Sequence, residues 1–146
     1  MPQGGAVDRL VAERLAAAGV RYTRARRAIV NALRAGEGPE SAAELDRRLR
    51  ARVPLSSLYR SLSVLEQAGV IAPHHGALTR YELAEWLSGH HHHLVCDQCG
   101  RVEDVEVDAG RERMLEELAG ALVDGFDFLA TGHSLEVEGL CASCRR

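Results

Sequence analysis

Four consecutive histidines, His90–His93, lie two residues before a Cys-x-x-Cys pair formed by Cys96 and Cys99. Imidazole nitrogens and thiolates are the side-chain groups that zinc and other transition metals prefer. A second such pair, Cys141 and Cys144, follows after 41 further residues. Each pair can close on one ion without straining the chain, and two pairs complete a tetrahedron. We therefore predict a structural zinc site with four thiolate ligands, because a redox-active dithiol would leave the second pair unexplained.

The histidine run is predicted to serve two further ions. The run is internal, whereas purification tags are placed at chain ends. In an extended strand successive side chains point to opposite faces, so His90 and His92 would lie opposite His91 and His93. We predict one metal site on each face. The candidate further ligands are His133 and Glu112 for the first face, and Glu82 with His74 or His75 for the second.

The first half of the chain is predicted to form short amphipathic helices. The first helix ends near Gly19, and the second begins near Thr23. The third opens with Ser41-Ala-Ala-Glu44, the pattern of a capping box, in which each side chain accepts a hydrogen bond from the other residue's backbone N–H.

A fourth helix is predicted over residues 55–68. Its apolar face is formed by Leu55, Leu58, Leu62 and Leu65, which recur at helical spacing. The opposite face carries short hydroxyls, an amide and an arginine, which can approach phosphates and base edges closely, although an ordinary solvated face has a similar composition. The residues of this outer face are Ser56, Arg60, Ser63 and Gln67, with Tyr59 at its margin.

A short hairpin is predicted after this helix, because "VIAPHH" and "TRYEL" flank a turn at Gly76-Ala77. Pro73 has no backbone N–H to donate, so its strand is expected at a sheet edge. Helices followed by a two-stranded wing are typical of a winged helix-turn-helix domain. We assign this domain to residues 1–83, with residues 55–68 as the recognition helix in the major groove of DNA.

The second half is predicted to be a small metal-binding domain. Residues 84–89, "AEWLSG", are interpreted as a hinge, and residues 90–146 as an α/β unit. Strands are expected in "HHHHLVC", "RVEDVEV" and "HSLEVEGL", with a helix over residues 110–123 before the last. Such a core is thin for an independent domain, so it needs a metal, a dimer partner or both. The predicted fold class is therefore α+β.

Charge differs strongly between the two halves. Residues 1–72 contain 12 arginines and 7 acidic residues, a net charge of +5, whereas residues 73–146 carry −8. A basic front half favours a nucleic-acid partner. The sequence has no apolar run that could span a bilayer and no signal-peptide pattern, so we expect a cytoplasmic protein without membrane contact. In that compartment four cysteines favour metal binding over disulfides.

Together these motifs resemble the ferric uptake regulator superfamily of metal-responsive transcription regulators. The resemblance covers nearly the whole chain, from "GVRYTRARRAIV" through "LYRSLSVLEQAGVI" and "YEL" to "HHHHLVCDQCGRVEDVE" and "HSLEVEGLCASC". It implies a homodimeric winged-helix protein that represses transcription from AT-rich palindromic operators in double-stranded DNA when metal is bound.

By this resemblance, Tyr59 and Arg60 contact DNA from the recognition helix, and Arg21 reaches the minor groove. The four cysteines match the structural zinc site of the family. With the hydroxyls at the start of the recognition helix, the predicted DNA-binding residues are Arg21, Ser56, Ser57, Tyr59 and Arg60.

The resemblance also implies two divalent-metal sites. Family members often place a histidine just before the third helix, where this chain has Pro39, so His74 or His75 is expected to substitute. The family's second site contains a glutamate in this helix. Aligning its position from one side of the helix gives the residue before Glu112, and aligning it from the other side gives the residue after, so Glu112 is chosen as the ligand. The predicted regulatory site near the hinge comprises His74 or His75 with Glu82, His91 and His93; the second site, in the dimerisation domain, comprises His90, His92, Glu112 and His133.

The sensed metal is predicted to be Fe²⁺ or Zn²⁺. Glu82 is the residue that iron sensors of the family carry, whereas His92 stands where those sensors often have aspartate. Sites rich in nitrogen ligands favour zinc or nickel, but affinity order does not settle which metal is bound in a cell. Manganese and nickel therefore stay open, as do a response to peroxide and the target genes.

Two other functions fit parts of the pattern. A zinc-stabilised dimerisation module that does not read DNA would keep the cysteines but leave Tyr59 and Arg60 without a role. A metal-assisted hydrolase would need an open coordination position and a general base, for which Glu82 or Glu112 could serve. Because the metal sites already use the histidines that such a centre would need, no enzyme activity is expected.

Overall fold

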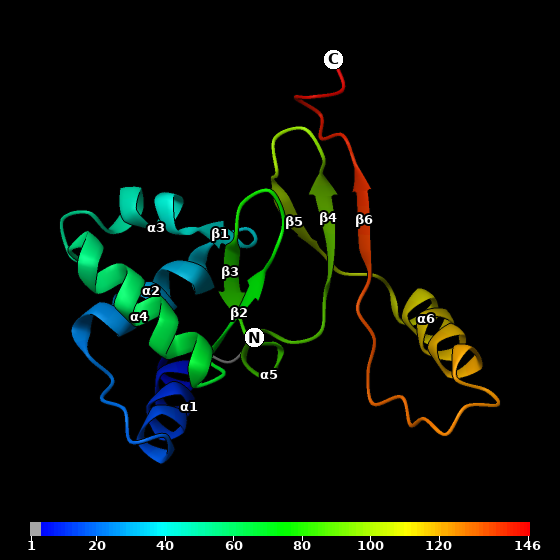
Figure 1. Ribbon diagram of the computed structural model, residues 1–146, viewed down its shortest axis with the longest axis horizontal. Coiled ribbons are helices and arrows are strands. Elements are labelled where there is room, and N and C mark those ends of the chain that lie inside the picture. The colour runs from blue at the N-terminus through cyan, green and yellow to red at the C-terminus, as the bar shows by residue number, and fades with distance from the viewer. Residues whose placement is uncertain (1–3) are drawn as a thin grey trace. The chain divides into compact units, whose positions relative to one another are not determined.

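The computed structural model describes residues 4–146, and the chain divides into two compact units with the boundary between His90 and His91 (Figure 1). Each unit combines a three-stranded sheet with helical structure, several helices in the first unit and α6 in the second, which confirms the predicted α+β fold class. Within residues 4–146, no helix combines the length and the apolar character that a membrane span requires.

The N-terminal unit contains the predicted helices and the wing. Thr23 caps the second helix by accepting a hydrogen bond from the backbone N–H of Arg26, as the sequence predicts for a start near Thr23. The elements in chain order are α1 (Gly4–Ala17), α2 (Arg24–Ala35), β1 (Glu40–Ser41), α3 (Ala42–Leu49), α4 (Leu55–Gln67), β2 (Ile71–His74), β3 (Arg80–Leu83) and α5 (Glu85–Ser88).

One apolar core stabilises this unit. Leu15 of α1, Ile29 of α2, Leu45 of α3 and Leu58 of α4 are fully buried in it. Burial of one such side chain contributes about 1.5–3 kcal/mol relative to leaving it exposed. The core therefore fixes the four helices against one another without any bound group.

Helix α4 ends one residue before the predicted boundary, and its apolar face is confirmed in part. Leu58, Leu62 and Leu65 are buried, but Leu55, which the sequence assigns to the same apolar face, is 53% exposed. Leu55 is the first residue of the helix, directly after the cap residue Pro54, and lies before the turn that meets the core. Ser61 is buried on the inner face instead.

The wing has three strands in the order β1-β3-β2, where the sequence predicted two. The additional strand, β1, has only two residues, and it pairs Glu40 with Tyr81 and Ser41 with Arg80. So short a strand shows no alternation that a sequence pattern could reveal. Pro73 lies in β2, which is an edge strand, as predicted.

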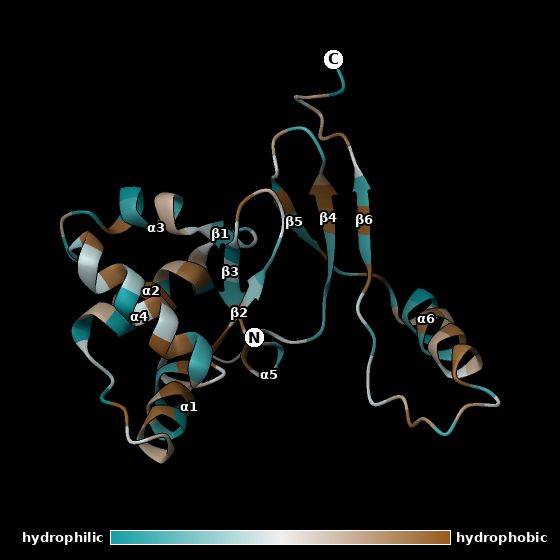
Figure 2. Cartoon of the chain, in the orientation of Figure 1, coloured by the Kyte–Doolittle hydropathy of each residue, from teal (hydrophilic) through white to brown (hydrophobic). Residues whose placement is uncertain are grey.

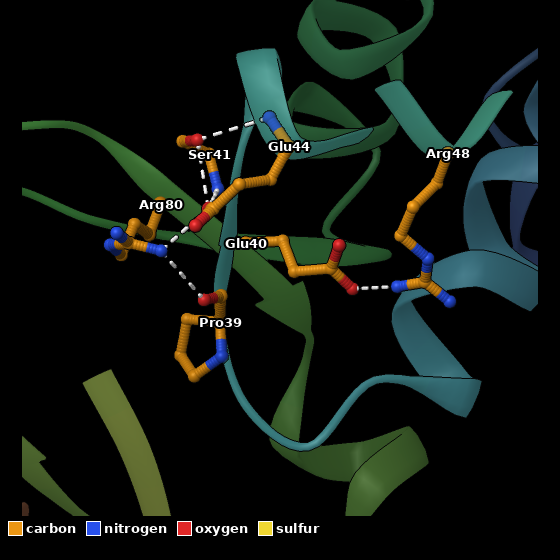
Figure 3. Close-up of polar contacts among 6 residues, drawn as sticks. All are labelled: Pro39, Glu40, Ser41, Glu44, Arg48 and Arg80. Atoms are coloured by element: carbon orange, nitrogen blue, oxygen red, sulfur yellow. Dashed lines mark hydrogen bonds and ion pairs between the residues drawn. The ribbon is translucent and has the colours of Figure 1, made fainter. Parts of the chain in front are cut away.

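A polar network joins β3 to the start of α3 (Figure 3). Arg80 is only 7% exposed, and its Nη1 donates to Glu44 Oε2 over 2.6 Å and to the carbonyl of Pro39 over 3.4 Å. Glu44 also accepts from the backbone N–H of Ser41 over 2.7 Å, so the predicted capping box is confirmed. Burial raises the pKa of the Glu44 carboxyl, but the hydrogen bonds from Ser41 and the charge of Arg80 lower it further, so the net pKa is below its ordinary value.

The segment predicted as a hinge, residues 84–89, contains helix α5 and lies within the N-terminal unit. Leu87 is buried in the core of that unit, and the indole N–H of Trp86 donates to the carbonyl of Gly69 over 2.8 Å. The Arg14 guanidinium lies over the Trp86 ring, 4.6 Å from its centroid. These contacts order a stretch that its composition alone marked as a linker.

The C-terminal unit contains the three predicted strands and one helix, namely β4 (His92–Cys96), β5 (Val102–Val105), α6 (Ala109–Leu122) and β6 (Glu136–Gly139). The sheet order is β5-β4-β6, with β4 antiparallel to β5 and parallel to β6. Only the second half of the central strand β4 is apolar (brown in Figure 2). The described residues of α6 include none that is buried, so this unit has the thin core that the sequence predicts.

Candidate metal centres and nucleic-acid interface

The four cysteines converge at one end of the C-terminal sheet. Cys96 ends β4, and its register partner in the parallel strand β6 is Gly139, two residues before Cys141. Parallel pairing therefore brings the two Cys-x-x-Cys pairs together across the 41-residue gap. Gly100 closes the first pair with a φ of 70°, a left-handed conformation that glycine adopts without strain. The four sulfur atoms all lie within 4.8 Å of one another.

This geometry fits a tetrahedral zinc ion. The sulfurs of Cys99 and Cys141 are 3.9 Å apart, and Zn–S bonds of about 2.3 Å place tetrahedral ligands about 3.8 Å apart. The backbone N–H of Cys141, which donates to Cys96 Sγ over 3.3 Å, is the main cause that lowers the pKa of the Cys96 thiol to about 6. The pKa of the Cys144 thiol is raised to about 12, chiefly by its hydrogen bond with Cys141. The raised pKa of Cys144 disfavours its thiolate form in the absence of a cation.

A second group of ligand atoms lies on one side of β4. His92 is 1% exposed, and its Nε2 lies 2.9 Å from Glu112 Oε2. The other oxygen of the same carboxylate lies 2.9 Å from His133 Nε2. Glu112 reaches this position because Asp108 caps α6 and places Glu112 in its first turn. One carboxylate therefore bridges two imidazoles, an arrangement of donors suited to a divalent transition metal.

A third group lies on the other side of β4. The Nε2 atoms of His91 and His93 are 3.8 and 3.6 Å from Asp104 Oδ1, and the two rings pack edge to face with centroids 5.0 Å apart. Asp104 is the register partner of His93 in β5, and Glu136 is its register partner in β6. The histidines thus alternate between faces, as predicted. The sequence prediction missed Asp104 and Glu136 because only the strand register places them beside His93.

The remaining predicted ligands lie in the N-terminal unit. His74 Nε2 is 2.7 Å from Glu82 Oε1, so the wing strands β2 and β3 bring these two side chains together. His75 lies exposed beyond the end of β2 and belongs to no potential ligand group among residues 4–146. His90 contacts the carboxylate of Glu85 in α5. Of the two wing histidines that the sequence left open, His74 is the one beside a carboxylate.

The predicted DNA-binding residues are accessible in the N-terminal unit. Tyr59 is 55% exposed on the outer face of α4, where Ser56 and Arg60 are also exposed and Ser57 is half-buried. Arg21 is exposed in the loop between α1 and α2. Tyr59, Ser56 and Arg60 are therefore accessible to a ligand on the outer face of α4.

A polar cluster holds the Arg21 loop in place. The Arg21 carbonyl accepts from the Arg26 guanidinium and, over 3.1 Å, from the backbone N–H of Thr23. The Tyr22 hydroxyl donates to Asp8 over 2.8 Å, and the same carboxylate forms an ion pair with Arg27. Burial, together with the Asp8 carboxylate, raises the pKa of Tyr22 well above its ordinary value. The backbone of Arg21 is thus fixed while its side chain stays exposed.

Comparisons with known proteins show which family this chain resembles. The model of the ferric uptake regulator family matches residues 17–135. The chain is 34% identical over 95 residues to the ferric uptake regulation protein of Legionella pneumophila, a match that covers 64% of this chain and 65% of that protein. It is 30% identical over 132 residues to the peroxide-responsive repressor PerR of Staphylococcus saprophyticus, which covers 87% of this chain and 84% of the relative.

A solved structure shows the same fold. The crystal structure of the Vibrio cholerae ferric uptake regulator superposes with a TM-score of 0.67 at 30% identity, covering 89% of this chain and 98% of that one. The family match spans most of both units and includes α4, the histidine run and the first Cys-x-x-Cys pair. The chain belongs to the ferric uptake regulator family.

Proposed function

We propose that this protein is a metal-dependent DNA-binding repressor of transcription that acts as a homodimer in the cytoplasm. The observation that carries the proposal is that successive histidines of one strand lie in two different groups of potential metal ligands. β4 sends His92 to the Glu112–His133 group and His93 to the Asp104 group. A winged helix supplies the DNA reader in the same chain, and relatives are named as a regulation protein and as a repressor.

In this proposal α4 enters the major groove of an AT-rich palindromic operator. Tyr59 and Arg60 contact base edges, because they lie exposed on the outer face of the recognition helix. Ser56 and Ser57 lie at the start of that helix, where hydroxyls reach phosphates. Arg21 enters the neighbouring minor groove, and its fixed backbone reduces the entropy that is lost on binding.

Metal is proposed to act at three places. The four thiolates hold a structural Zn²⁺ that stabilises the C-terminal unit. His90, His92, Glu112 and His133 form a second divalent site. The proposed regulatory site takes Glu82 and His74 from the wing together with His91 and His93; within the C-terminal unit, Asp104 lies beside these two histidines. Fe²⁺ or Zn²⁺ is the proposed regulatory ion, because both accept mixed imidazole and carboxylate ligands.

A ligand can shift a conformational equilibrium only by the difference in its affinity for the two states. A regulatory site with ligands from residues 1–83 and from residues 90–146 satisfies this condition, because it is complete in some arrangements of the domains and incomplete in others. The proposal assigns these histidines to metal binding and none of them to catalysis.

The C-terminal unit supports dimerisation. In α6 and the segment after it, Met114, Leu118, Leu122 and Phe126 are each more than half exposed. An exposed apolar surface of this kind marks a protein–protein contact in a soluble chain. A twofold dimer would also place two copies of α4 on the two halves of a palindrome.

The test is a titration of the apo dimer against a labelled AT-rich palindromic duplex, with and without Fe²⁺ or Zn²⁺. We expect metal to tighten binding and expect the variant His93→Ala to lose that response. The matched control is His75→Ala, which removes an exposed histidine outside the ligand groups. If metal changes the affinity of the unmodified protein less than twofold, about 0.4 kcal/mol, the proposal is wrong.

A further inference from the structure

The helix-turn-helix carries arginines that are not among the predicted DNA-binding residues. Residues 47–65 contain five arginines and no aspartate or glutamate. One of them, Arg60, belongs to the recognition face, and the other four are Arg47, Arg48, Arg50 and Arg52. All five side chains are exposed. The end of α3, the turn and most of α4 therefore carry positive charge only.

Three arginines of this unit form ion pairs with carboxylates. Arg27 forms an ion pair with Asp8, Arg48 with Glu40 and Arg80 with Glu44. Within residues 4–146, by contrast, no carboxylate forms an ion pair with Arg47 at the end of α3 or with Arg50 and Arg52 in the turn after it. Their charge is therefore available to an external anion.

The turn that carries Arg50 and Arg52 is hydrogen-bonded to the end of α3. The backbone N–H groups of Arg52 and Val53 donate to the carbonyl of Leu49 over 2.7 and 2.9 Å. Leu49 and Val53 are both buried in the core, one on each side of the exposed Arg50 and Arg52. In Figure 1 the turn lies at the edge of the unit, directly before the first turn of α4. A ligand on the outer face of α4 would therefore extend toward this turn.

We propose that Arg47, Arg50 and Arg52 form a phosphate-binding surface that grips the DNA backbone next to the base-reading face of α4. This inference rests on the proposed function, because the phosphates belong to the operator duplex. The surface contributes affinity and salt dependence but no sequence preference, since phosphates are the same at every base pair. Sequence discrimination stays with Tyr59 and Arg60.

The experiment measures the affinity of the full-length, metal-loaded dimer for an AT-rich palindromic duplex and for a scrambled duplex over a range of salt concentrations. One triple variant replaces the three arginines with alanine. A second replaces them with lysine, which retains the positive charge and can still contact a phosphate. The single variant Arg50→Ala is compared with a control, Arg9→Ala, which removes one exposed arginine from α1 of the same unit.

We expect the alanine variant to lose affinity for both duplexes by the same factor, with its preference for the palindrome unchanged. The slope of log affinity against log salt should flatten by roughly 0.9 for each phosphate that the variant no longer neutralises. The lysine variant should keep most of the slope, and Arg50→Ala should flatten it more than Arg9→Ala does. Thermal unfolding of each variant checks that the unit is folded.

An unchanged salt slope in the folded alanine variant would overturn the inference, as would a loss of affinity confined to the palindrome. If the alanine variant did not fold, the single substitutions Arg50→Ala and Arg52→Ala would give the same decision from their slopes. Failure of the proposed function gives a different result, because then the unmodified dimer shows no metal-dependent preference for the palindrome.

Discussion

The two units of this chain bury opposite kinds of residue. The N-terminal unit encloses an apolar cluster that runs from Val7 to Leu87. In the C-terminal unit, the described buried positions are His92, His93, Cys96 and Val102, while large apolar side chains of α6 lie exposed. The first unit is therefore stabilised by its own core, whereas the second buries potential metal ligands and leaves an apolar surface exposed.

Metal removal should have the largest effect and should separate the two units. Binding of structural zinc contributes roughly 10–16 kcal/mol in zinc-finger peptides, where it is also folding free energy. We expect a strong chelator to remove hydrogen-exchange protection from β4, β5 and β6 while α4 stays protected, and we expect added Zn²⁺ to restore the sheet. Cys141→Ser should cause the same loss of protection as the chelator, and added Zn²⁺ should not reverse it. Equal loss of protection in both units would contradict the claim that metal stabilises the C-terminal unit alone.

Leu58→Ala should test whether the N-terminal unit is stabilised by its own apolar core. Leu58 is fully buried, so its truncation leaves a cavity and should lower the free energy of unfolding of the N-terminal unit by about 2–5 kcal/mol. Because this core includes no metal ligand, the loss should be the same with chelator and with zinc. Urea denaturation followed by the fluorescence of Trp86, which contacts this unit, measures it. A loss that depends on metal would show that the units are not independent.

Arg80→Met should have a smaller effect that depends on pH. It leaves the partly buried Glu44 carboxylate without its ion-pair partner, which costs about 1–3 kcal/mol at neutral pH. The folded-state pKa of Glu44 lies below its ordinary value of 4.5, so this carboxylate stabilises the fold above that pH. The contribution is lost as pH falls through the lower folded-state pKa.

The difference in stability between Arg80→Met and the unmodified protein should therefore shrink in acid. Glu44→Gln is the matched control, because its amide does not titrate and its stability should lose this pH dependence. A difference that stays constant from neutral pH to acid well below the ordinary pKa of Glu44 would show that Arg80 acts through packing alone.

Leu118→Asp should have the smallest effect on each protomer and a clear effect on assembly. Leu118 is 57% exposed, so the change should alter protomer stability by less than about 0.5 kcal/mol. If α6 is part of the dimer contact, the charge should raise the dimer dissociation constant, measured by sedimentation. Glu116→Gln, an exposed change on the same helix, is the control. An unchanged dissociation constant would exclude Leu118 from the contact.

Local chemistry in the sequence predicted much of this structure. The capping box of Ser41 and Glu44, the edge position of Pro73 and the alternation of His92 and His93 each depend on residues close together in the chain. Spacing alone also predicted a four-thiol cluster, because each Cys-x-x-Cys pair is a local unit.

The features that the sequence did not predict depend on contacts between distant residues. β1 forms because Ser41 pairs with Arg80, and α5 packs because Trp86 reaches Gly69. Asp104 reaches His93 only through the register of β4 and β5, which pairs residues that are 11 positions apart in the chain. Leu55 was misplaced because helical periodicity does not say at which turn a helix meets the core.

The central claim is that metal and operator DNA stabilise the same state of the protein. Thermodynamic linkage requires that, if metal raises operator affinity by some factor, operator DNA raises metal affinity by the same factor. The decisive measurement is therefore made on a dimer whose cysteine site is filled and whose regulatory site is empty. Its affinity for Zn²⁺ or Fe²⁺ is measured in the presence and in the absence of saturating palindromic duplex. We expect tighter metal binding with DNA, by the factor that the DNA titration gives. Equal metal affinities with and without the duplex would contradict the account.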